Sequence, residues 1–211
     1  MVSGYLSPAG AGVSEVIEKR SRFIGHVVPV NSETEAREEI ARVKTQYHDA
    51  RHNCWCYTLR GGPERYSDDG EPQGSAGLPM LEIFRRNEIS DACCIVTRYF
   101  GGILLGTGGL SRAYSEAAKK ALENAGIAEY AQYECMSASC PYNLLGTIKS
   151  NIETMGGVIE NIDYGESVKM QIAVPAGRPA AINKRLAELS AGAVTGIVTG
   201  EKWVTLKSAS G

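Results

Sequence analysis

The order of the secondary-structure elements predicted after residue 130 constrains the fold more than any other feature of this 211-residue chain. Leu145, Ile148 and Ile152 recur at helical spacing. Predicted strands cover 135–140, 158–163, 168–174 and 195–206, and predicted helices cover 143–155 and 178–189. This order is βαββαβ, the split ferredoxin-like pattern. The stretch is long enough for a domain, so domains are predicted at 1–130 and 131–211, with the boundary near Glu129 to Gln132.

The first half of the chain mixes strands and helices in a different order. Strands are predicted over 13–19, 23–30, 54–59 and 92–98, and helices over 32–47, 75–86 and 108–125. Ser32 with Glu35 three residues later forms a capping box at the start of the first helix. The segment ACCIVTR at 92–98 is apolar without alternation, so both of its faces are predicted to be buried. The fold class is therefore α+β.

The composition excludes some classes of function. The formal net charge is −2, from 22 basic and 24 acidic residues, so bulk charge does not indicate a dedicated nucleic-acid binder, and only a local basic patch stays open. No segment approaches the roughly 18 apolar residues of a membrane span, and the N-terminal residues lack a signal-peptide pattern. The protein is predicted to be cytoplasmic, and its six cysteines are expected to be reduced there.

Three acids lie in four positions at Asp68, Asp69 and Glu71, with Gly70 among them. The spacing does not match an EF-hand loop, but Asp68 and Glu71 are the oxygen ligands that Mg²⁺ prefers. They are also candidates for a general acid/base pair. The alternative is a turn, because Asp-Gly and Glu-Pro are turn dipeptides and Gly70 can adopt a positive φ. We favour the turn or an interaction loop, and no metal is assigned.

The segment HDARHNCWC carries four zinc-type ligands at His48, His52, Cys54 and Cys56. The two histidines fit the usual ligand spacing, whereas a C-x-C pair on a strand does not. The favoured interpretation is that both cysteines are small buried apolar residues. A Cys–His nucleophile pair is a further alternative, but no third group is present to orient the histidine.

The segment GGILLGTGGLSR resembles nucleotide-binding loops without satisfying either motif. Thr107 replaces the lysine of a P-loop, and Ser111 replaces the last glycine of a dinucleotide-binding loop. A glycine loop nevertheless leads into a helix, so the amides of Gly106, Gly108 and Gly109, with Arg98 and Arg112, suit an anion. The alternative is close packing of the loop, with the arginines paired to the acids at 68, 69 or 71.

These segments resemble the YigZ/IMPACT family. The resemblance is carried by SRF at 21–23, DARHNCW at 49–55, SDDGEPQGSAGLP at 67–79 and VTRYFGGILLGTGGLSRAY at 96–114. Ser75 stands where the family usually has threonine, which keeps the hydroxyl group. The resemblance implies a first domain like the second domain of a small-subunit ribosomal protein. It also implies a ferredoxin-like second domain similar to the C-terminal domain of elongation factor G.

The same resemblance implies a role near translation. Eukaryotic relatives join this first domain to a different N-terminal module and restrain an initiation-factor kinase. This sequence starts almost directly with the family domain, so regulation of that kinase is not expected here. We predict RNA or the ribosome as partner, with a protein partner as an alternative, no cofactor, no assigned catalytic residue, and a monomer or small homo-oligomer. The other hypotheses are an enzyme acting on a phosphorylated small molecule or peptide and an interaction module. A basic face joining Arg98, Arg112, Arg85 and Arg86 would favour RNA, and a mixed-charge pocket would favour an enzyme.

Overall fold

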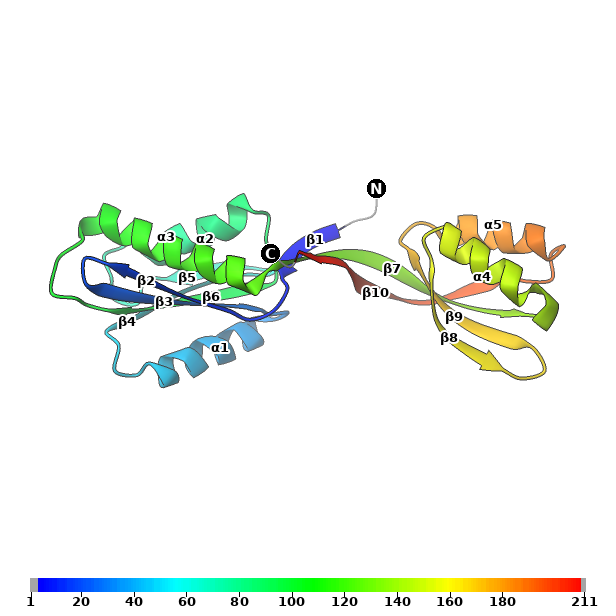
Figure 1. Cartoon of the computed structure of the whole chain (residues 1–211), viewed down its shortest axis with the longest axis horizontal. Helices are drawn as coiled ribbons and strands as arrows, with labels where there is room; N and C mark the ends of the chain where they lie inside the picture. Colours follow the sequence, from blue (N-terminus) through cyan, green and yellow to red (C-terminus); the bar gives the residue numbers. More distant parts are fainter. Residues whose placement is uncertain (1–3, 210–211) are drawn as a thin grey trace. The chain divides into compact units, whose positions relative to one another are not determined.

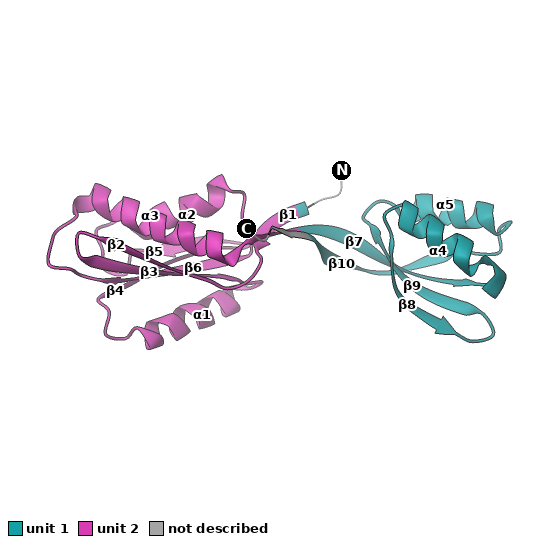
Figure 2. Cartoon of the chain, in the orientation of Figure 1, with its two compact units in different colours: residues 1–4, 130–206 teal, residues 5–129, 207–211 magenta. Residues whose placement is uncertain are grey.

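The computed structural model describes residues 4–209, and side chains as far as residue 206. The described residues form an α+β fold with two sheets and five α-helices, in agreement with the predicted fold class (Figure 1). They divide into two compact units, one built mainly from residues 5–129 and the other from residues 130–206 (Figure 2). Each unit is described by itself below.

The unit of residues 5–129 is a five-stranded sheet with helices on both faces. The strand order is β2-β3-β6-β4-β5, and neighbouring strands pair antiparallel. Helix α1 covers one face, and α2 and α3 cover the other (Figure 1). The strands are β2 (Gly12–Glu18), β3 (Ser21–Pro29), β4 (His52–Thr58), β5 (Glu64–Ser67) and β6 (Ala92–Tyr99). The helices are α1 (Glu33–Gln46), α2 (Gly77–Arg86) and α3 (Gly106–Ala125).

Strand β6 is the central strand, and it separates two hydrophobic cores. Cys94 and Val96 belong to the core under α2 and α3, while Cys93 and Ile95 belong to the core under α1. All four are fully buried, as the continuous apolar run predicted. Alternation along the strand decides which core each side chain enters.

The start of α1 was also readable from sequence. The Ser32 hydroxyl accepts a hydrogen bond from the Glu35 amide at 3.1 Å, which satisfies one free donor of the first turn. The reciprocal bond is displaced by one residue, because Glu35 accepts from the amide of Asn31 at 2.8 Å rather than from that of Ser32. The predicted cap is therefore confirmed, with a shifted partner.

The unit of residues 130–206 has the predicted element order βαββαβ. Strand β9 lies between β8 and β7, and β10 pairs with β7 on its other side. Buried Ile148, Ile152, Ile182 and Leu186 pack from the helices onto this sheet. The elements are β7 (Ile127–Cys140), α4 (Leu145–Thr154) after a short 3₁₀ turn (Tyr142–Leu144), β8 (Val158–Tyr164), β9 (Val168–Pro175), α5 (Pro179–Leu189) and β10 (Gly196–Ala209).

Three details differ from the sequence prediction. Strand β1 (Gly4–Pro8) was missed, and it pairs with β7. Strand β5 was missed because its residues ERYS are exposed or half-buried and show no apolar alternation. Strand β7 begins eight residues before the predicted Cys135, so Glu129 to Gln132 lie inside a regular strand.

In the part of the chain that the structure describes, no helix has the length and apolar character needed to span a bilayer.

Candidate functional site

The site is built on a row of side chains across three strands. In the sheet register, Arg98 of β6 lies directly opposite Phe23 of β3 on one side and His52 of β4 on the other. Alternation from Cys94 and Val96 places Arg98 on the face that α2 and α3 cover. The row therefore brings a cation, an imidazole and an aromatic ring together beneath α3.

The loop of residues 68–71, called the acid loop below, stabilises the start of α2 through Asp68. Its carboxylate accepts hydrogen bonds from the amides of Gly74 at 2.8 Å, Ala76 at 3.0 Å and Gly77 at 2.9 Å. These amides surround the first residue of α2, where backbone donors lack helical partners. Asp68 thus caps the N-terminus of α2 although it lies nine residues before the helix begins. This structural role agrees with the interpretation of the acidic segment as a turn.

Asp69 ties the same loop to its neighbours. One carboxylate oxygen accepts from Lys44 Nζ and the other from the Asn53 amide, both at 2.7 Å. The backbone turns here, with φ of 43° at Asp69 and 85° at Gly70. Glycine adopts such values without steric cost, while Asp69 is held in them by its two contacts. The turn directs the next side chain, Glu71, into the protein.

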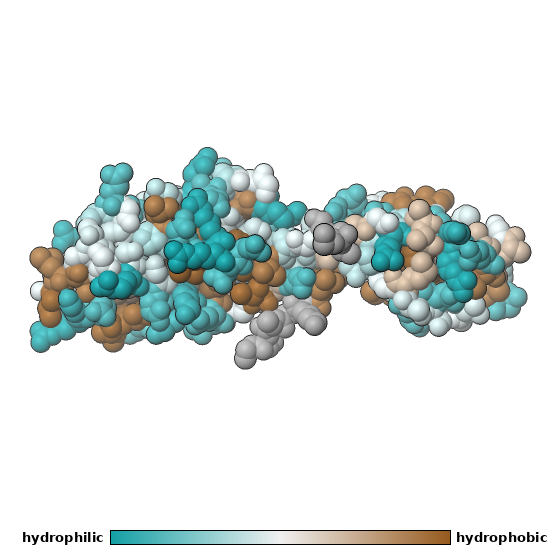
Figure 3. All heavy atoms as spheres, turned by 90° about the horizontal axis from the view of Figure 1, so that it is seen from above, coloured by the Kyte–Doolittle hydropathy of each residue, from teal (hydrophilic) through white to brown (hydrophobic). Residues whose placement is uncertain are grey.

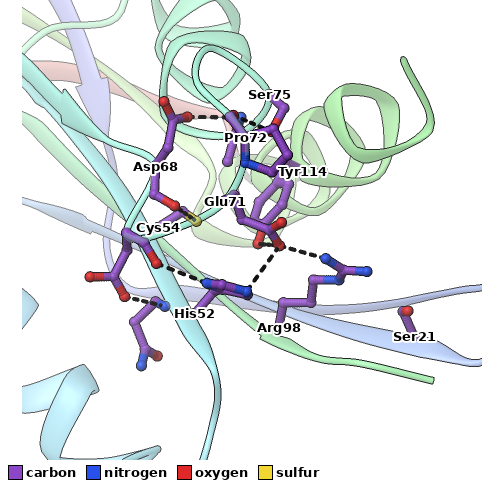
Figure 4. Close-up of polar contacts among 12 residues, drawn as sticks. Ser21, His52, Cys54, Asp68, Glu71, Pro72, Ser75, Arg98 and Tyr114 are labelled. Atoms are coloured by element: carbon purple, nitrogen blue, oxygen red, sulfur yellow. Dashed lines mark hydrogen bonds and ion pairs between the residues drawn. The ribbon is translucent and has the colours of Figure 1, made fainter. Parts of the chain in front are cut away.

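Glu71 is the centre of the site (Figure 4). Its side chain is only 3% exposed, and Oε1 accepts from Arg98 Nη1 at 2.6 Å and from the Tyr114 hydroxyl at 2.8 Å. His52 Nε2 lies 4.0 Å from the same oxygen. The expected contact between the acid loop and an arginine is therefore confirmed for Glu71 and Arg98. A buried carboxylate requires such partners, because removing a charge from water is costly.

The hydrogen bond at the other ring nitrogen determines the tautomer of His52. Nδ1 lies 2.8 Å from the carbonyl oxygen of Asp69, which can only accept, so Nδ1 carries the proton. In the neutral ring Nε2 is then an acceptor facing Glu71. Burial, with Cys54 and Glu71 beside it, raises the pKa of the Tyr114 phenol, so Tyr114 remains a donor. The site therefore groups an imidazole, a phenol and a guanidinium around the Glu71 carboxylate.

The cysteines of β4 do not supply a nucleophile. Cys54 is fully buried and its thiol donates to the carbonyl oxygen of Asp68 at 2.9 Å. Burial raises the pKa of Cys54 to about 12, so the reactive thiolate is scarce at neutral pH. Burial likewise raises the pKa of Cys56, which faces Cys94 across the sheet. Within residues 4–206, no three His, Cys, Asp or Glu side chains are grouped so as to hold a metal ion.

The SRF motif at 21–23 anchors the glycine loop through Ser21. The Ser21 hydroxyl accepts from the Gly101 amide at 3.1 Å, and a Cβ at Gly101 would lie 2.0 Å from the Arg20 carbonyl carbon. Glycine is required there for this close approach. Phe23 packs edge-on against Tyr114 with ring centroids 5.1 Å apart, and the Arg98 guanidinium lies over the Phe23 and Phe100 rings at 5.5 Å.

A cavity of about 410 Å³ opens beside this cluster. Its polar wall comes from β4, the acid loop and β6, and its apolar wall comes from the glycine loop and the first turn of α3. The lining residues are Arg51, His52, Gly70, Glu71, Pro72, Arg98, Phe100, Leu104, Leu105, Gly106, Thr107 and Leu110. Residue Leu105 precedes α3 and supplies no side-chain cap, so the amides of the first turn, near Gly106, have no side-chain acceptor.

Arg112 does not belong to this cavity. It is exposed and lines a separate groove of about 610 Å³ together with Arg86, Lys119, Glu18 and Glu116. The residues predicted to bind an anion are thus divided between two places. Gly106 lines the cavity together with Arg98, whereas Gly109 lines the groove of Arg112. A Cβ at Gly108 would lie 3.9 Å from the Arg112 side chain.

The basic face considered from sequence does not include Arg98. Arg98 is 6% exposed and is paired with Glu71, so its charge is neutralised beneath α3. Arg85 forms ion pairs with Glu64 and Glu82, both at 2.6 Å. Arg86 and Arg112 remain on the surface. The structure therefore separates a mixed-charge cavity from a groove that carries exposed cations.

Sequence reasoning missed Tyr114 and the apolar wall of the cavity. A signal for Tyr114 was present, because it lies four residues after Leu110 and three before Ala117 on the buried face of an alanine-rich helix. A buried tyrosine hydroxyl needs a hydrogen-bond partner, and an unassigned acid was the natural candidate. Phe100 and Leu104 gave no signal, because a glycine loop has no periodicity.

Two protein-family models match the chain: the Impact N-terminal domain over residues 19–122 and a domain of unknown function (DUF1949) over residues 139–193. IMPACT family member YvyE of Bacillus subtilis is 37% identical over 194 residues, which cover 91% of this chain and 89% of YvyE. IMPACT family member YigZ of Escherichia coli is 34% identical over 199 residues, which cover 92% of this chain and 97% of YigZ.

The chain is also similar to a solved structure over most of its length. That structure is described only as the crystal structure of a hypothetical protein, it is 31% identical, and its TM-score is 0.61 over 94% of this chain and 98% of that chain. The motifs that carry the resemblance, including SDDGEPQGSAGLP and the glycine loop, lie within the matched Impact N-terminal domain. The chain belongs to the IMPACT family.

Proposed function

We propose that the cavity beside Glu71 binds a small anionic ligand, carrying a phosphate or a carboxylate. The observation that carries this proposal is the state of Arg98. Its side chain is 7% exposed, yet its Nε has no hydrogen-bond partner among the described residues. A buried donor without a partner is unfavourable, so Glu71 alone does not satisfy the Arg98 guanidinium. Because Arg98 also lines the cavity, an anionic ligand bound there would supply a further acceptor to this side chain.

The electrostatics of the cavity favour the same ligand. Arg51 and Arg98 contribute two positive charges and Glu71 contributes one negative charge, so the lining carries a net positive charge even when His52 is neutral. The uncapped first turn of α3 adds backbone donors and the positive end of the helix dipole. Arginine is well suited to phosphate and carboxylate, because its donors are fixed in one plane.

Inorganic phosphate titrated into ¹⁵N-labelled protein tests this proposal. We expect the amide signals of Gly106 and Thr107 to shift, and Arg51→Gln to weaken binding severalfold. Arg112→Gln is the matched control. It likewise replaces an exposed arginine, but Arg112 lies outside the cavity. Shifts centred on Arg112, with no effect of Arg51→Gln, would contradict the cavity as the anion site.

A second candidate function is RNA binding through the groove of Arg112. The observation that favours it is the presence of three cations, Arg86, Arg112 and Lys119, along one groove between α2 and α3. Glu18 and Glu116 also line it, and Lys119 lies 3.7 Å from Glu123, so the positive field is weak. The resemblance of the domains to those of a ribosomal protein and elongation factor G supports such a partner by analogy of fold alone.

A further inference from the structure

The lip of the Glu71 cavity is unusually apolar for an anion site. The loop between β6 and α3 exposes three large side chains in five residues: Phe100 is 47% exposed, Ile103 is 41% exposed and Leu104 is 83% exposed. Hydrophobic atoms are visible in Figure 3 at the end of the unit where, in Figure 1, this loop lies. Single exposed apolar residues need no explanation, but a contiguous group marks a binding surface.

This apolar lip is continuous with the charged floor. Phe100 and Leu104 line the same cavity as Arg98 and His52, and the Arg98 guanidinium lies over the Phe100 ring. Leu105 and Leu110 extend the apolar wall inward from the lip. A ligand whose head contacts the arginine would therefore place whatever is attached to that head against leucine and phenylalanine side chains.

We propose that the ligand is an amphipathic anion: a small organic molecule with one phosphate or carboxylate head attached to an apolar chain or ring. This inference rests on the proposed anion site and names its ligand class. The head contacts Arg98 and the first-turn amides of α3, and the apolar part packs on Phe100, Leu104 and Leu110. The cavity volume of about 410 Å³ lies in the range of small-molecule sites.

Other features of the molecule give weaker evidence for a binding site than the Glu71 cavity does. Val13 and Ile17 are exposed on edge strand β2, but nothing in the structure indicates what would cover them. Cys56 and Cys94 face each other across the sheet, but both are buried away from any oxidant. The Glu71 cavity is distinguished by having a charged floor and an apolar lip that together select one ligand chemistry.

Two matched pairs of probes test the inference by titration monitored by NMR. Hexanoate is compared with acetate, and phenyl phosphate is compared with inorganic phosphate, so that each pair shares a head and differs only in its apolar part. Because each buried methylene favours binding, we expect the tailed member to bind about tenfold more tightly in each pair. A preference confined to one pair identifies the head as carboxylate or phosphate and still supports an amphipathic ligand.

The variant Leu104→Ser removes part of the lip, and because Leu104 is 83% exposed we expect the protein to stay folded. We expect it to reduce the preference for the tailed probes severalfold and to leave the bare anions unaffected. Ile17→Ser is the matched control, since it removes an exposed apolar side chain outside the cavity. Equal binding of tailed and bare anions, or equal effects of the two variants, would overturn this inference and leave the anion site standing. Failure of all four probes to bind would overturn both.

Discussion

The two sides of α3 present arginines in opposite physical states. On one side Arg98 is buried, paired with Glu71 and enclosed by Phe23 and Phe100. On the other side Arg112 is exposed in a groove with other cations. Both belong to one glycine-rich segment of 17 residues, yet burial and pairing give them different chemistry. Membership in a motif does not by itself assign a residue to a site.

Arg98 and Arg112 also differ in how much each contributes to the stability of the fold. A buried ion pair constrains the fold strongly, because removing one member leaves the other charge unpaired in a poorly solvated place. An exposed arginine contributes little to stability, because water screens its charge. Substitutions of the buried Glu71–Arg98 pair should therefore lower stability strongly, whereas substitution of the exposed Arg112 should leave stability nearly unchanged.

The largest expected effect is that of Glu71→Gln. The neutral amide keeps the shape but leaves the Arg98 charge buried without its counterion, so we expect unfolding free energy to fall by roughly 3–5 kcal/mol. Urea denaturation measures the change. Glu116→Gln on the groove side is the control and should lie within about 0.5 kcal/mol of the wild type. Equal effects of the two substitutions would remove the distinction between the two sides.

Tyr114→Phe should have a smaller effect on the same cluster. The change deletes one hydrogen bond to Glu71 and keeps the edge-on contact with Phe23, so we expect a loss of about 1–2 kcal/mol. Tyr99→Phe is the matched control, because its hydroxyl donates to Asp49 at 2.7 Å on the exposed surface. That control should be close to neutral, and a larger loss for Tyr99→Phe would contradict the importance assigned to burial.

The pH dependence of stability extends the comparison to the other face of the sheet. Burial, followed by the charge of Arg42, lowers the pKa of His26, which lies 3.2 Å from the Tyr47 hydroxyl. The unfolded chain therefore binds a proton at about pH 6.5, where the folded chain does not, so stability should fall as pH drops below that value. In urea denaturation across this range, His26→Gln should flatten the profile. An unchanged slope would show that other groups dominate.

Local sequence features predicted much of the fold. ACCIVTR predicted a strand buried on both faces, and Ser32 with Glu35 predicted the helix start to within a residue. The division between the two arginines was also readable in principle. Alternation from Cys94 and Val96 places Arg98 in the core, while Arg112 is two residues from Leu110 and so points away from the buried face of its helix.

The position of Glu71 could not be read in this way. Its direction depends on positive φ values at Asp69 and Gly70, and Asp69 is held in that conformation by Lys44 and Asn53, which are distant in sequence. Nothing local requires those contacts. The contact of Glu71 with Arg98 was expected from the need to pair a buried charge, but the choice of Glu71 over Asp68 depends on this turn.

The smallest effect on stability, and the most informative about RNA, is expected for Arg112→Ala. The exposed side chain forms no ion pair with any residue between 4 and 206, so the unfolding free energy should change by less than about 0.5 kcal/mol. If the groove binds RNA, affinity for a structured RNA should fall, and the slope of log affinity against log salt should decrease by about one unit, because one phosphate contact is lost. Arg85→Ala is the matched control, since Arg85 is already engaged by Glu64 and Glu82. A wild-type protein without salt-sensitive RNA binding would exclude the groove as an RNA site and leave the Glu71 cavity as the functional side of α3.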